Sequence, residues 1–259
     1  MIDITETSIS NIEEIQEEKT QLEKVRDTSK RAMTFFDEEL FHEAEIQTTD
    51  PSKDFDITHN HKIGTGGFGK VFKVKRRSDD KVCALKFCNP RSEQEKNLLI
   101  NEIGLMNHCR NNENVLKIFK SYDYRDRIWI FLELMDVDLT SFITTHQLSY
   151  SENVVKYILK RTLEGLAHLH SEGIIHRDIK SDNILASSLG QIKLADFGYS
   201  CRLAPEEDKR MSRVGTVPWM APELLQGKSS GDNTSIDVWS FGILAIELAK
   251  GEPPNMRKP

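Results

Sequence analysis

The sequence of 259 residues contains no long apolar run, so no helix that crosses a bilayer is expected. Its first residues lack a basic start followed by an apolar stretch, and a secretory signal is therefore not expected either. Hydrophobic residues make up 38% of the chain, which is low for a compact domain, whereas charged residues make up 29%. These values favour a globular body, of one large domain or two lobes, with a polar extension.

Cysteine is also scarce. The chain has four cysteines, at positions 83, 88, 109 and 201. None of them forms a Cys-x-x-Cys pair, and no histidine cluster completes a zinc-binding pattern. This usage favours reduced thiols, and we expect a cytoplasmic protein.

Charge is unevenly spread along the chain. Residues 1–50 contain 14 Asp and Glu against 5 Lys and Arg, whereas the rest contains 27 against 30. The near-neutral body gives no electrostatic support for a nucleic-acid partner. Apolar residues recur at loosely helical spacing in residues 1–50, which we interpret as an acidic extension, partly helical or disordered, or else a docking helix. A turn at residues 50–53 marks the start of a second domain over residues 51–259.

The pattern of apolar residues predicts an α+β fold in two lobes. Alternation from Phe55 to Phe87 indicates strands, and further strands are expected at residues 115–122 and 128–132. The helix between these strands has a capping box and one apolar face, formed by Ser92, Glu95, Leu99, Ile103 and Met106. We expect a β-rich N-lobe at 55–132, a hinge at 133–138 and a mainly helical C-lobe at 139–259.

One helix of the larger lobe has clear end signals. Ser149 and Glu152 form a capping box, and apolar residues then recur at helical spacing. Gly173 is expected to end this helix.

Glycine is concentrated at residues 64–69, in the order Gly-Thr-Gly-Gly-Phe-Gly. A dinucleotide-binding turn would lead into a helix, whereas residues 71–75 have strand periodicity. A P-loop would carry Ser or Thr where Val71 stands. Because Gly-x-Gly-x-x-Gly is a weak signal alone, an ordinary glycine hairpin remains the alternative to a phosphate-covering loop.

A lysine and a glutamate are predicted to pair beside this loop. Strand alternation places Ala84 and Lys86 on the face that the loop covers. Glu102 lies on the apolar face of the following helix, where an inward carboxylate needs a partner. Glu93 and Glu95 lie in the first turn and need only favour the helix dipole. We therefore predict that Lys86 pairs with Glu102, the alternative being a helix-edge glutamate in water.

Further strings carry a family resemblance. They are His-Arg-Asp-Ile-Lys-Ser-Asp-Asn at 176–183, Asp-Phe-Gly at 196–198 and Ala-Pro-Glu at 221–223. With the glycine-rich loop and Lys86, they resemble the eukaryotic protein kinase signature set over about residues 57 to 254. Residues 215–223 and 237–248 also resemble the Sterile-20 group, especially its PAK-type branch. The resemblance implies a Ser/Thr protein kinase, in an intracellular signalling cascade, that transfers the γ-phosphate of magnesium-ATP to protein hydroxyls.

The resemblance implies a role for each catalytic residue. Asp178 would accept the proton of the substrate hydroxyl, and Lys180 would reach the γ-phosphate. Thr216 would bridge Asp178 and Lys180, while Lys86, held by Glu102, would bind the α- and β-phosphates.

The same resemblance implies metal ligands and a turn. Asn183 and Asp196 would supply oxygen ligands to Mg²⁺, with Mn²⁺ able to substitute. Gly198 would allow a sharp turn after Phe197.

ATP contacts are implied for the glycine-rich loop, the first strands and the hinge. Leu132 falls at the gatekeeper position, and Glu133 with Met135 would hold adenine through hinge backbone groups. The residues implied to bind ATP are Ile63, Gly64, Gly66, Gly67, Gly69, Val71, Ala84, Lys86, Leu132, Glu133, Met135 and Leu185. The hydrophobic spine of the family maps onto Met106, Ile118, His176 and Phe197, and Asp237 would brace the His176 region.

Regulation is implied by the same family. Ser212 aligns with the phosphorylated hydroxyl of PAK-type kinases, and its phosphate would pair with Arg177; a merely exposed loop serine is the alternative. The expected partners are a protein substrate and an upstream activating kinase, or a second copy acting in trans. Residues 1–56 carry no signature for a Rho-family GTPase, so such a partner is not supported.

The last residues depart from the family pattern. The sequence ends at Pro259, whereas kinases of this type continue with more helices. We therefore expect an incomplete C-lobe, an unpaired Glu223 and exposed apolar surface. The competing hypothesis is an inactive, pseudokinase-like binding or scaffold module.

Overall fold

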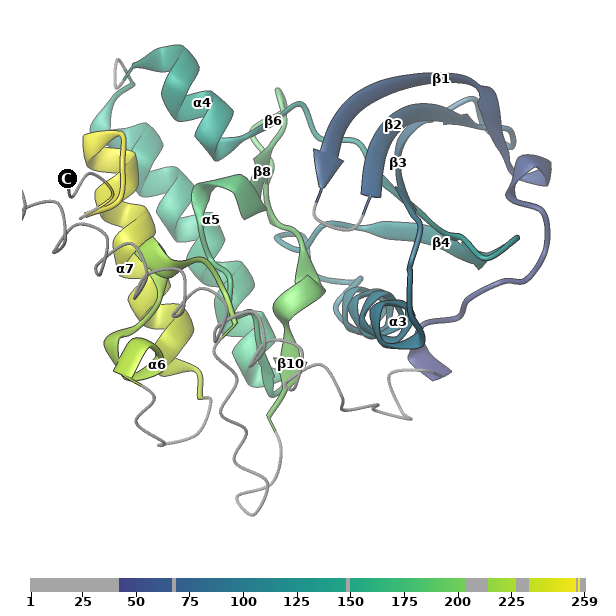
Figure 1. The fold of residues 1–259 in the computed structure, drawn as a ribbon. Coiled ribbons are helices and arrows are strands. Elements are labelled where there is room, and N and C mark those ends of the chain that lie inside the picture. Colours follow the sequence, from purple (N-terminus) through teal and green to yellow (C-terminus); the bar gives the residue numbers. More distant parts are fainter. Residues whose placement is uncertain are drawn as a thin grey trace, which may run out of the picture.

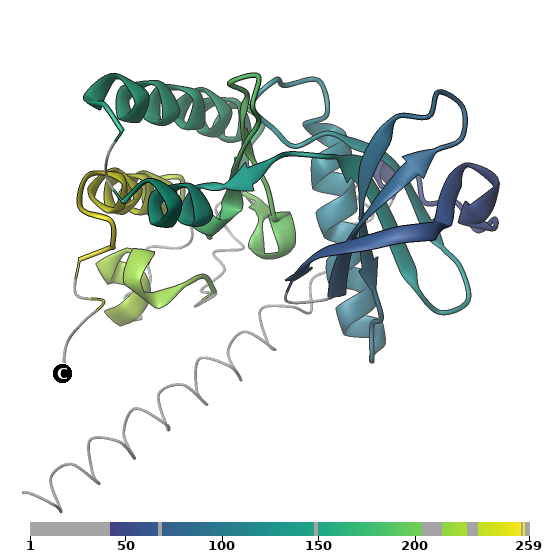
Figure 2. The same ribbon diagram turned by 90° about the horizontal axis from the view of Figure 1, so that it is seen from above.

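Two lobes make up the chain in a computed structural model that describes residues 42–66, 69–147, 150–203, 214–226, 233–254 and 256 (Figure 1). The smaller lobe is built on a β-sheet and the larger one mainly on helices. The predicted α+β, two-lobed fold is confirmed. Figure 2 shows that the chain crosses between the lobes at β6 (Val137–Asp138), within the predicted hinge.

Five antiparallel strands form the sheet of the small lobe, in the order β1-β2-β3-β5-β4. Their bounds are β1 Phe55–Gly66, β2 Gly69–Arg76, β3 Val82–Cys88, β4 Ile118–Asp123 and β5 Ile128–Glu133. Strand β4 begins three residues later than the sequence pattern predicted. Val115 instead forms an isolated bridge to Leu194, a residue of the large lobe, so its apolar side chain belongs to the contact between the lobes.

The alternation within β3 sorts its side chains between two faces of the sheet, as predicted. On the outer face, Cys83 and Leu85 belong to an aromatic-rich cluster. Within this cluster the rings of Phe55 and Phe131 stack with centroids 3.6 Å apart. Ala84 and Lys86 face the opposite side, toward the other lobe and the cavity described below.

Helix α3 (Glu93–His108) packs below the sheet (Figure 1). Its N-cap is Ser92, as predicted, because Ser92 Oγ accepts a hydrogen bond from the Glu95 N–H at 3.2 Å. The Glu95 carboxylate accepts from the Arg91 N–H rather than from the N-cap residue, so the capping box is only half formed. The apolar face that carries Leu99 and Ile103 is buried, and Glu102 lies on it.

Residues 42–50 lie against the small lobe, although the sequence placed them in the acidic extension. Ala44 is fully buried in the main core cluster. Gln47 pairs with Tyr122 in a parallel bridge, so this segment extends the edge of the sheet at β4. The short 3₁₀ helix η1 (Pro51–Lys53) follows, and its N-cap is Asp50, the residue at which we placed the boundary.

The large lobe is mainly helical. Its elements are α4 Leu139–His146, α5 Glu152–Ser171, α6 Pro222–Gln226, α7 Ser235–Lys250, β6 Val137–Asp138, β7 Ile174–Ile175, β8 Ile184–Ala186, β9 Ile192–Leu194, β10 Cys201–Arg202, η2 Ser181–Asn183, η3 Phe197–Tyr199 and η4 Val217–Trp219. Helices α5 and α7 pack together, and Leu166, Leu169, Leu244 and Leu248 belong to one buried cluster (Figure 2).

The start of α5 corrects one expectation. Ser149 lies outside the described residues, and the N-cap is Ser151, whose side chain makes no capping hydrogen bond. Glu152 is therefore the first helical residue rather than the third, and the predicted capping box is wrong. The predicted stop is confirmed, because the helix ends at Ser171 and Gly173 adopts a φ of 69°.

Two surface expectations concern the larger lobe. Val238 and Trp239 of α7 are exposed at 58% and 45%, as expected for apolar surface in this region. Within the described part of the chain, no helix is both long enough and apolar enough to span a membrane.

The stacked pair on the outer face of the sheet generates a stability prediction. Phe55→Ala removes a fully buried ring, and we expect the free energy of unfolding to fall by about 3–5 kcal/mol. Urea unfolding followed by tryptophan fluorescence measures this loss. Leu189→Ala is the control, because Leu189 is 87% exposed and its truncation should change stability by no more than about 0.5 kcal/mol. Equal losses in the two variants would contradict the packing role of Phe55.

Candidate active site

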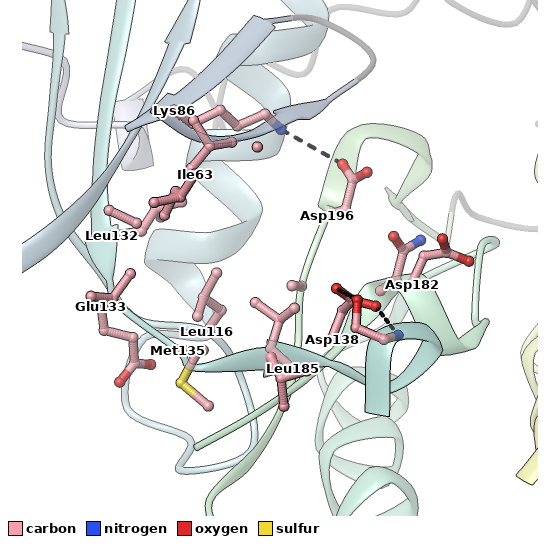
Figure 3. Close-up of a pocket in the computed structure, with 18 of the residues that line it drawn as sticks. Ile63, Lys86, Leu116, Leu132, Glu133, Met135, Asp138, Asp182, Leu185 and Asp196 are labelled. Atoms are coloured by element: carbon pink, nitrogen blue, oxygen red, sulfur yellow. Dashed lines mark hydrogen bonds and ion pairs between the residues drawn. The ribbon is translucent and has the colours of Figure 1, made fainter. Parts of the chain in front are cut away.

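A cavity of about 700 Å³ lies between the lobes (Figure 3). Its walls come from β1, β3, the hinge, η2 and β8. Of the residues implied to bind ATP, those that line the cavity are Ile63, Gly64, Val71, Ala84, Lys86, Leu132, Glu133, Met135 and Leu185. The structure therefore gathers residues from 63 to 185 around one space, with an apolar half near Leu132 and a charged half near Lys86.

Three glycines of the implied set remain. Gly66 and Gly67 are not among the residues whose surroundings the structure describes, and Gly69 does not line the cavity. A Cβ atom on Gly69 would collide with the backbone oxygen of Phe87 on the neighbouring strand. Close approach of β2 to β3 is therefore sufficient reason for a glycine at position 69. Thr65, which sequence reasoning missed, does line the cavity.

Lys86 lies between two carboxylates. Its Nζ is 2.6 Å from Glu102 Oε1. The same atom is 3.6 Å from Asp196 Oδ1 (Figure 3). Burial alone would lower the pKa of Lys86, but Glu102 and then Asp196 outweigh it and raise that pKa, so the ammonium stays charged. Burial raises the pKa of Glu102, and the Lys86 ammonium opposes this shift. Within the described residues, Glu102 Oε2 is buried without a hydrogen-bond partner, which leaves Lys86 as the contact that stabilises this carboxylate.

Asp196 has an unusual backbone conformation. It adopts a φ of 60°, in the left-handed region, just before the short helix η3. The chain turns tightly at η3, where a turn after Phe197 was expected, but the positive φ lies at Asp196 and not at Gly198. Burial alone would raise the pKa of Asp196, but Lys86 first and then His176 outweigh it, and that pKa lies below its ordinary value. The carboxylate is 49% exposed and faces the cavity.

Asp178 lies at the centre of a second polar cluster, in contact with Thr216, Lys180 and Asn183. Its Oδ1 accepts a hydrogen bond from Thr216 Oγ1 at 2.7 Å. Its Oδ2 lies 2.9 Å from Lys180 Nζ and 2.8 Å from Asn183 Nδ2. Lys180 Nζ also donates to Thr216 Oγ1 at 2.6 Å, so Thr216 bridges Asp178 and Lys180 as the resemblance implies.

Thr216 is fixed by the residue before it. Gly215 adopts a φ of 120°, and a Cβ at this position would lie 2.6 Å from the backbone oxygen of Arg177. Only glycine allows this close approach of the loop at 214–216 to the segment that carries Asp178.

Asp237 of α7 braces the backbone next to Asp178. Its Oδ2 accepts from the His176 N–H at 2.8 Å and contacts His170 Nε2 at 2.9 Å, and its Oδ1 accepts from the Arg177 N–H at 2.8 Å. Arg177 itself adopts a φ of 65°, and these hydrogen bonds stabilise the strained turn.

The predicted spine residues lie between the two lobes. Met106, Ile118 and Phe197 belong to the main core cluster, and His176 meets Phe197 edge-on with ring centroids 5.2 Å apart. His176 Nε2 also contacts the backbone oxygen of Ala195 at 3.1 Å, next to Asp196. The spine therefore joins the segment that carries Asp178 to the one that carries Asp196.

The donor set at the charged end fits a hard divalent cation that also has ligands from a bound phosphate. Asn183 donates both Nδ2 hydrogen bonds to Asp178, which turns its Oδ1 away from that residue. Asp196 adds a carboxylate with a lowered pKa. No group of three or more His, Cys, Asp or Glu side chains that would hold a metal by itself occurs among the residues with assigned positions. Oxygen donors in this number suit a cation that keeps water or phosphate ligands.

Comparisons with known proteins agree with this geometry. A family model described as "Protein kinase domain" matches residues 57–258. The chain belongs to the protein kinase family. Serine/threonine-protein kinase pakB of Dictyostelium discoideum is 41% identical over 83% of this chain and 25% of its own length. Serine/threonine-protein kinase shk1/pak1 of Schizosaccharomyces pombe is 40% identical over 76% and 29%, and PAK 4 of Mus musculus is 39% identical over 76% and 33%.

These relatives confirm the predicted resemblance to Sterile-20, PAK-type kinases. The chain spans about a quarter to a third of their length. Membership implies that this kinase domain uses ATP and a divalent metal.

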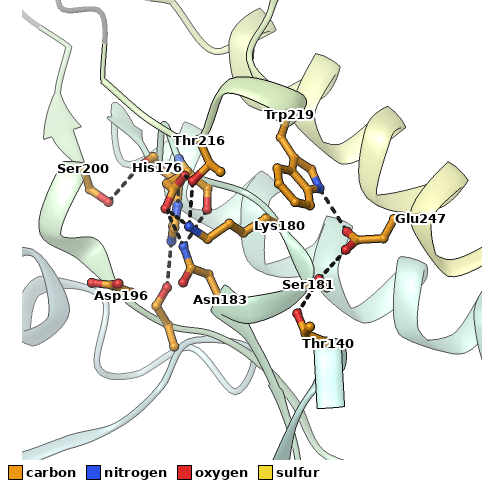
Figure 4. Close-up of polar contacts among 12 residues, drawn as sticks. Thr140, His176, Lys180, Ser181, Asn183, Asp196, Ser200, Thr216, Trp219 and Glu247 are labelled. Atoms are coloured by element: carbon orange, nitrogen blue, oxygen red, sulfur yellow. Dashed lines mark hydrogen bonds and ion pairs between the residues drawn. The ribbon is translucent and has the colours of Figure 1, made fainter. Parts of the chain in front are cut away.

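The structure adds a polar network to the kinase site that sequence reasoning missed (Figure 4). Glu247 of α7 is buried and accepts from Ser181 Oγ at 2.5 Å and from Trp219 Nε1 at 2.9 Å. The Ser181 hydroxyl has one proton, which it donates to Glu247. In the contact between Thr140 Oγ1 and Ser181 Oγ at 2.6 Å, Thr140 is therefore the donor. Burial raises the pKa of Glu247, and the two donors oppose this shift. The network joins two residues to α7: Ser181, which follows Lys180, and Trp219, which lies three residues after Thr216.

A second unexpected contact lies behind the hinge of the kinase domain. Lys193 Nζ is 2.8 Å from Glu133 Oε1, and the same oxygen accepts from the Lys117 N–H at 2.6 Å. The hinge is thereby joined to β9, which leads to Asp196. Neither network has a sequence signal beyond its residue types, because the partners are distant along the chain.

Two further expectations concern the segment that follows Asp196. Ser212 lies outside the described residues. Arg177 Nε donates to the backbone oxygen of Tyr199 at 2.5 Å, so the arginine holds the start of this segment. No hydrogen bond or ion pair of the Glu223 carboxylate is found within the part of the chain that the structure describes.

The buried pair of the kinase site generates a prediction. Lys86→Met leaves Glu102 without its partner, and we expect the free energy of unfolding to fall by about 3–5 kcal/mol. The loss of Lys86 raises the pKa of Glu102 further above its unfolded value. The stability deficit is therefore full above that raised pKa and shrinks as pH falls through it toward the unfolded value.

Urea unfolding at several pH values measures this deficit. The double variant Lys86→Met with Glu102→Leu removes both charges, and it should recover most of the loss. A double variant as unstable as Lys86→Met alone, with the same pH dependence, would contradict the assigned pairing.

Proposed function

We propose that the protein is a Ser/Thr protein kinase that transfers the γ-phosphate of magnesium-ATP to hydroxyl groups of protein substrates. The observation that carries this proposal is the convergence of Lys86, Asp196, Lys180 and Asn183 on one cavity, with Asp178 in contact with two of them. Bound ATP supplies the phosphoryl group, and the divalent ion offsets its negative charge.

Asp178 has the geometry of the residue that receives the substrate hydroxyl. Three donors contact its carboxylate, from Thr216, Lys180 and Asn183, and they fix its orientation. An ionised carboxylate accepts hydrogen bonds only, so it orients a hydroxyl and takes up its proton. Lys180, at the rim of the cavity, is then placed to contact the transferring group.

Lys86 and the metal ligands serve the other end of the phosphate chain. The Glu102 carboxylate keeps the Lys86 side chain extended into the cavity, where its ammonium binds the α- and β-phosphates. Asn183 and Asp196 would hold Mg²⁺, with Mn²⁺ able to replace it because both ions accept oxygen ligands. Leu132, Glu133 and Met135 form the wall that would receive adenine.

Regulation by phosphate on Ser212 is part of the proposal. A phosphoserine adds negative charge that an arginine can bind, and Arg177 next to Asp178 is the proposed receiver. An upstream kinase, or a second copy in trans, would supply this phosphate. The described cysteines are free thiols, which supports a cytoplasmic setting.

The catalytic role of Asp178 leads to a prediction for phosphoryl transfer. Asp178→Asn keeps the shape of the side chain but removes the anion, and kcat for a generic basic protein substrate should fall at least about 100-fold. Transfer of label from radiolabelled ATP measures kcat, and nucleotide binding is measured separately. Asp79→Asn, in an exposed turn of the small lobe, is the matched control and should retain full activity. A wild-type protein that binds ATP without transferring label would instead indicate a pseudokinase-like binding module.

Ser212 leads to a second prediction. Ser212→Ala should lower kcat at least about tenfold, because an activation segment without phosphate loses its pairing with Arg177. The dissociation constant for ATP should stay within about twofold of wild type, since Ser212 is remote in sequence from the residues that line the cavity. The matched control is Ser78→Ala in the turn of the small lobe. Full activity of Ser212→Ala protein would refute this regulatory role.

A further inference from the structure

A short segment ahead of the matched kinase region is built into the domain. The family match begins at residue 57, whereas the described chain begins at residue 42. The Asn107 amide, near the end of α3, donates to the backbone oxygens of Glu43 at 3.1 Å and Ala44 at 2.9 Å. Figure 1 shows this segment passing below α3 before it rises to η1 and β1. Residues that precede the matched region therefore hold the end of α3.

Glu43 lies where three elements meet. One guanidinium nitrogen of Arg202 is 3.0 and 3.1 Å from the two Glu43 carboxylate oxygens. His108, the last residue of α3, has its Nδ1 3.3 Å from the same carboxylate. The other ring nitrogen of His108 is 3.0 Å from Glu172, which directly follows α5 in the large lobe. This Glu43 cluster thus joins the small lobe, the chain after Asp196 and the large lobe.

The elements that meet at Glu43 also carry the charged end of the active site. Helix α3 carries Glu102, and Arg202 follows Asp196 by six residues. The chain from Asp196 to Leu203 is also held at other points, because Asn101 Nδ2 donates to the Ser200 oxygen at 3.2 Å and the Leu203 N–H donates to the Gly173 oxygen at 2.7 Å. A shift of α3 relative to this chain would change how Glu102 and Asp196 share Lys86.

We propose that Glu43 is a positioning residue for the kinase site. By holding Arg202 and His108 together, its carboxylate keeps α3 and the chain after Asp196 in the arrangement in which Glu102 and Asp196 both face Lys86. The contact is stronger than an ordinary surface pair because both side chains are partly buried, at 21% and 33% exposure. The catalytic part of this inference rests on the proposed function, whereas its structural part does not.

The test uses Glu43→Gln in the full chain. This change removes the charge and keeps both the side-chain volume and the backbone oxygen that Asn107 contacts. We expect kcat for protein phosphorylation to fall about three- to tenfold, with KM for ATP within about twofold of wild type. Glu45→Gln is the matched control, because the Glu45 carboxylate pairs with Arg110 at 3.3 Å in an exposed position, and its loss should leave kcat unchanged.

A thermodynamic cycle separates positioning from general damage. Arg202→Gln should lower kcat by at least the same factor, because it also removes the contact of the guanidinium with His108 Nδ1 at 3.1 Å. The double variant should be no worse than Arg202→Gln alone, since Glu43→Gln then has no guanidinium contact left to lose. Multiplied losses in the double variant would overturn the proposal.

Hydrogen exchange provides a readout that needs no catalysis. Amides of residues 102–108 and 197–203 should exchange about tenfold faster in Glu43→Gln protein than in wild type, and at the wild-type rate in Glu45→Gln protein. Equal rates in the two variants would overturn the positioning role. An inactive wild type that still shows the predicted exchange difference would refute the proposed function and support the structural part of the inference.

Discussion

The contact between Lys86 and Glu102 is the interaction on which the rest of the site depends. Two opposite charges lie 2.6 Å apart in a buried setting, where either one alone would be costly. This pair joins β3 to α3 and leaves the Lys86 ammonium facing Asp196 from across the cavity. The positions of the sheet, of α3 and of the large lobe relative to one another therefore determine which carboxylates surround the Lys86 Nζ atom.

The large lobe also buries carboxylates of α7, and among the described residues these have no lysine or arginine partner. Asp237 and Glu247 are both buried on α7, and each is satisfied by donors from segments far away in sequence. Asp237 fixes the backbone before Asp178, whereas Glu247 ties Ser181 to Trp219. A single helix thus holds both the segment that carries Asp178 and the one that carries Thr216. The triangle of Asp178, Lys180 and Thr216 is a consequence of this support.

Local patterns predicted part of this arrangement. Strand alternation placed Lys86 toward the cavity, and helix periodicity selected Glu102, because both depend on the repeat of the backbone alone. Errors arose where local signals competed. Ser149 and Ser151 both resemble an N-cap, and Gly198 is the obvious turn residue although Asp196 adopts the positive φ. Gly69 resembles a phosphate-loop glycine, yet its closest constraint is the neighbouring strand.

The two-lobed class, the order of the motifs and the residue types of the site could all be predicted from the chain, since they follow from periodicity, spacing and family resemblance. Which distant groups meet became known from the folded structure alone. The contacts of Glu247 with Ser181 and Trp219, of Lys193 with Glu133, and of Glu43 with Arg202 join residues separated by tens of positions or more. Such contacts depend on how whole elements pack, and no local pattern of residues encodes that packing.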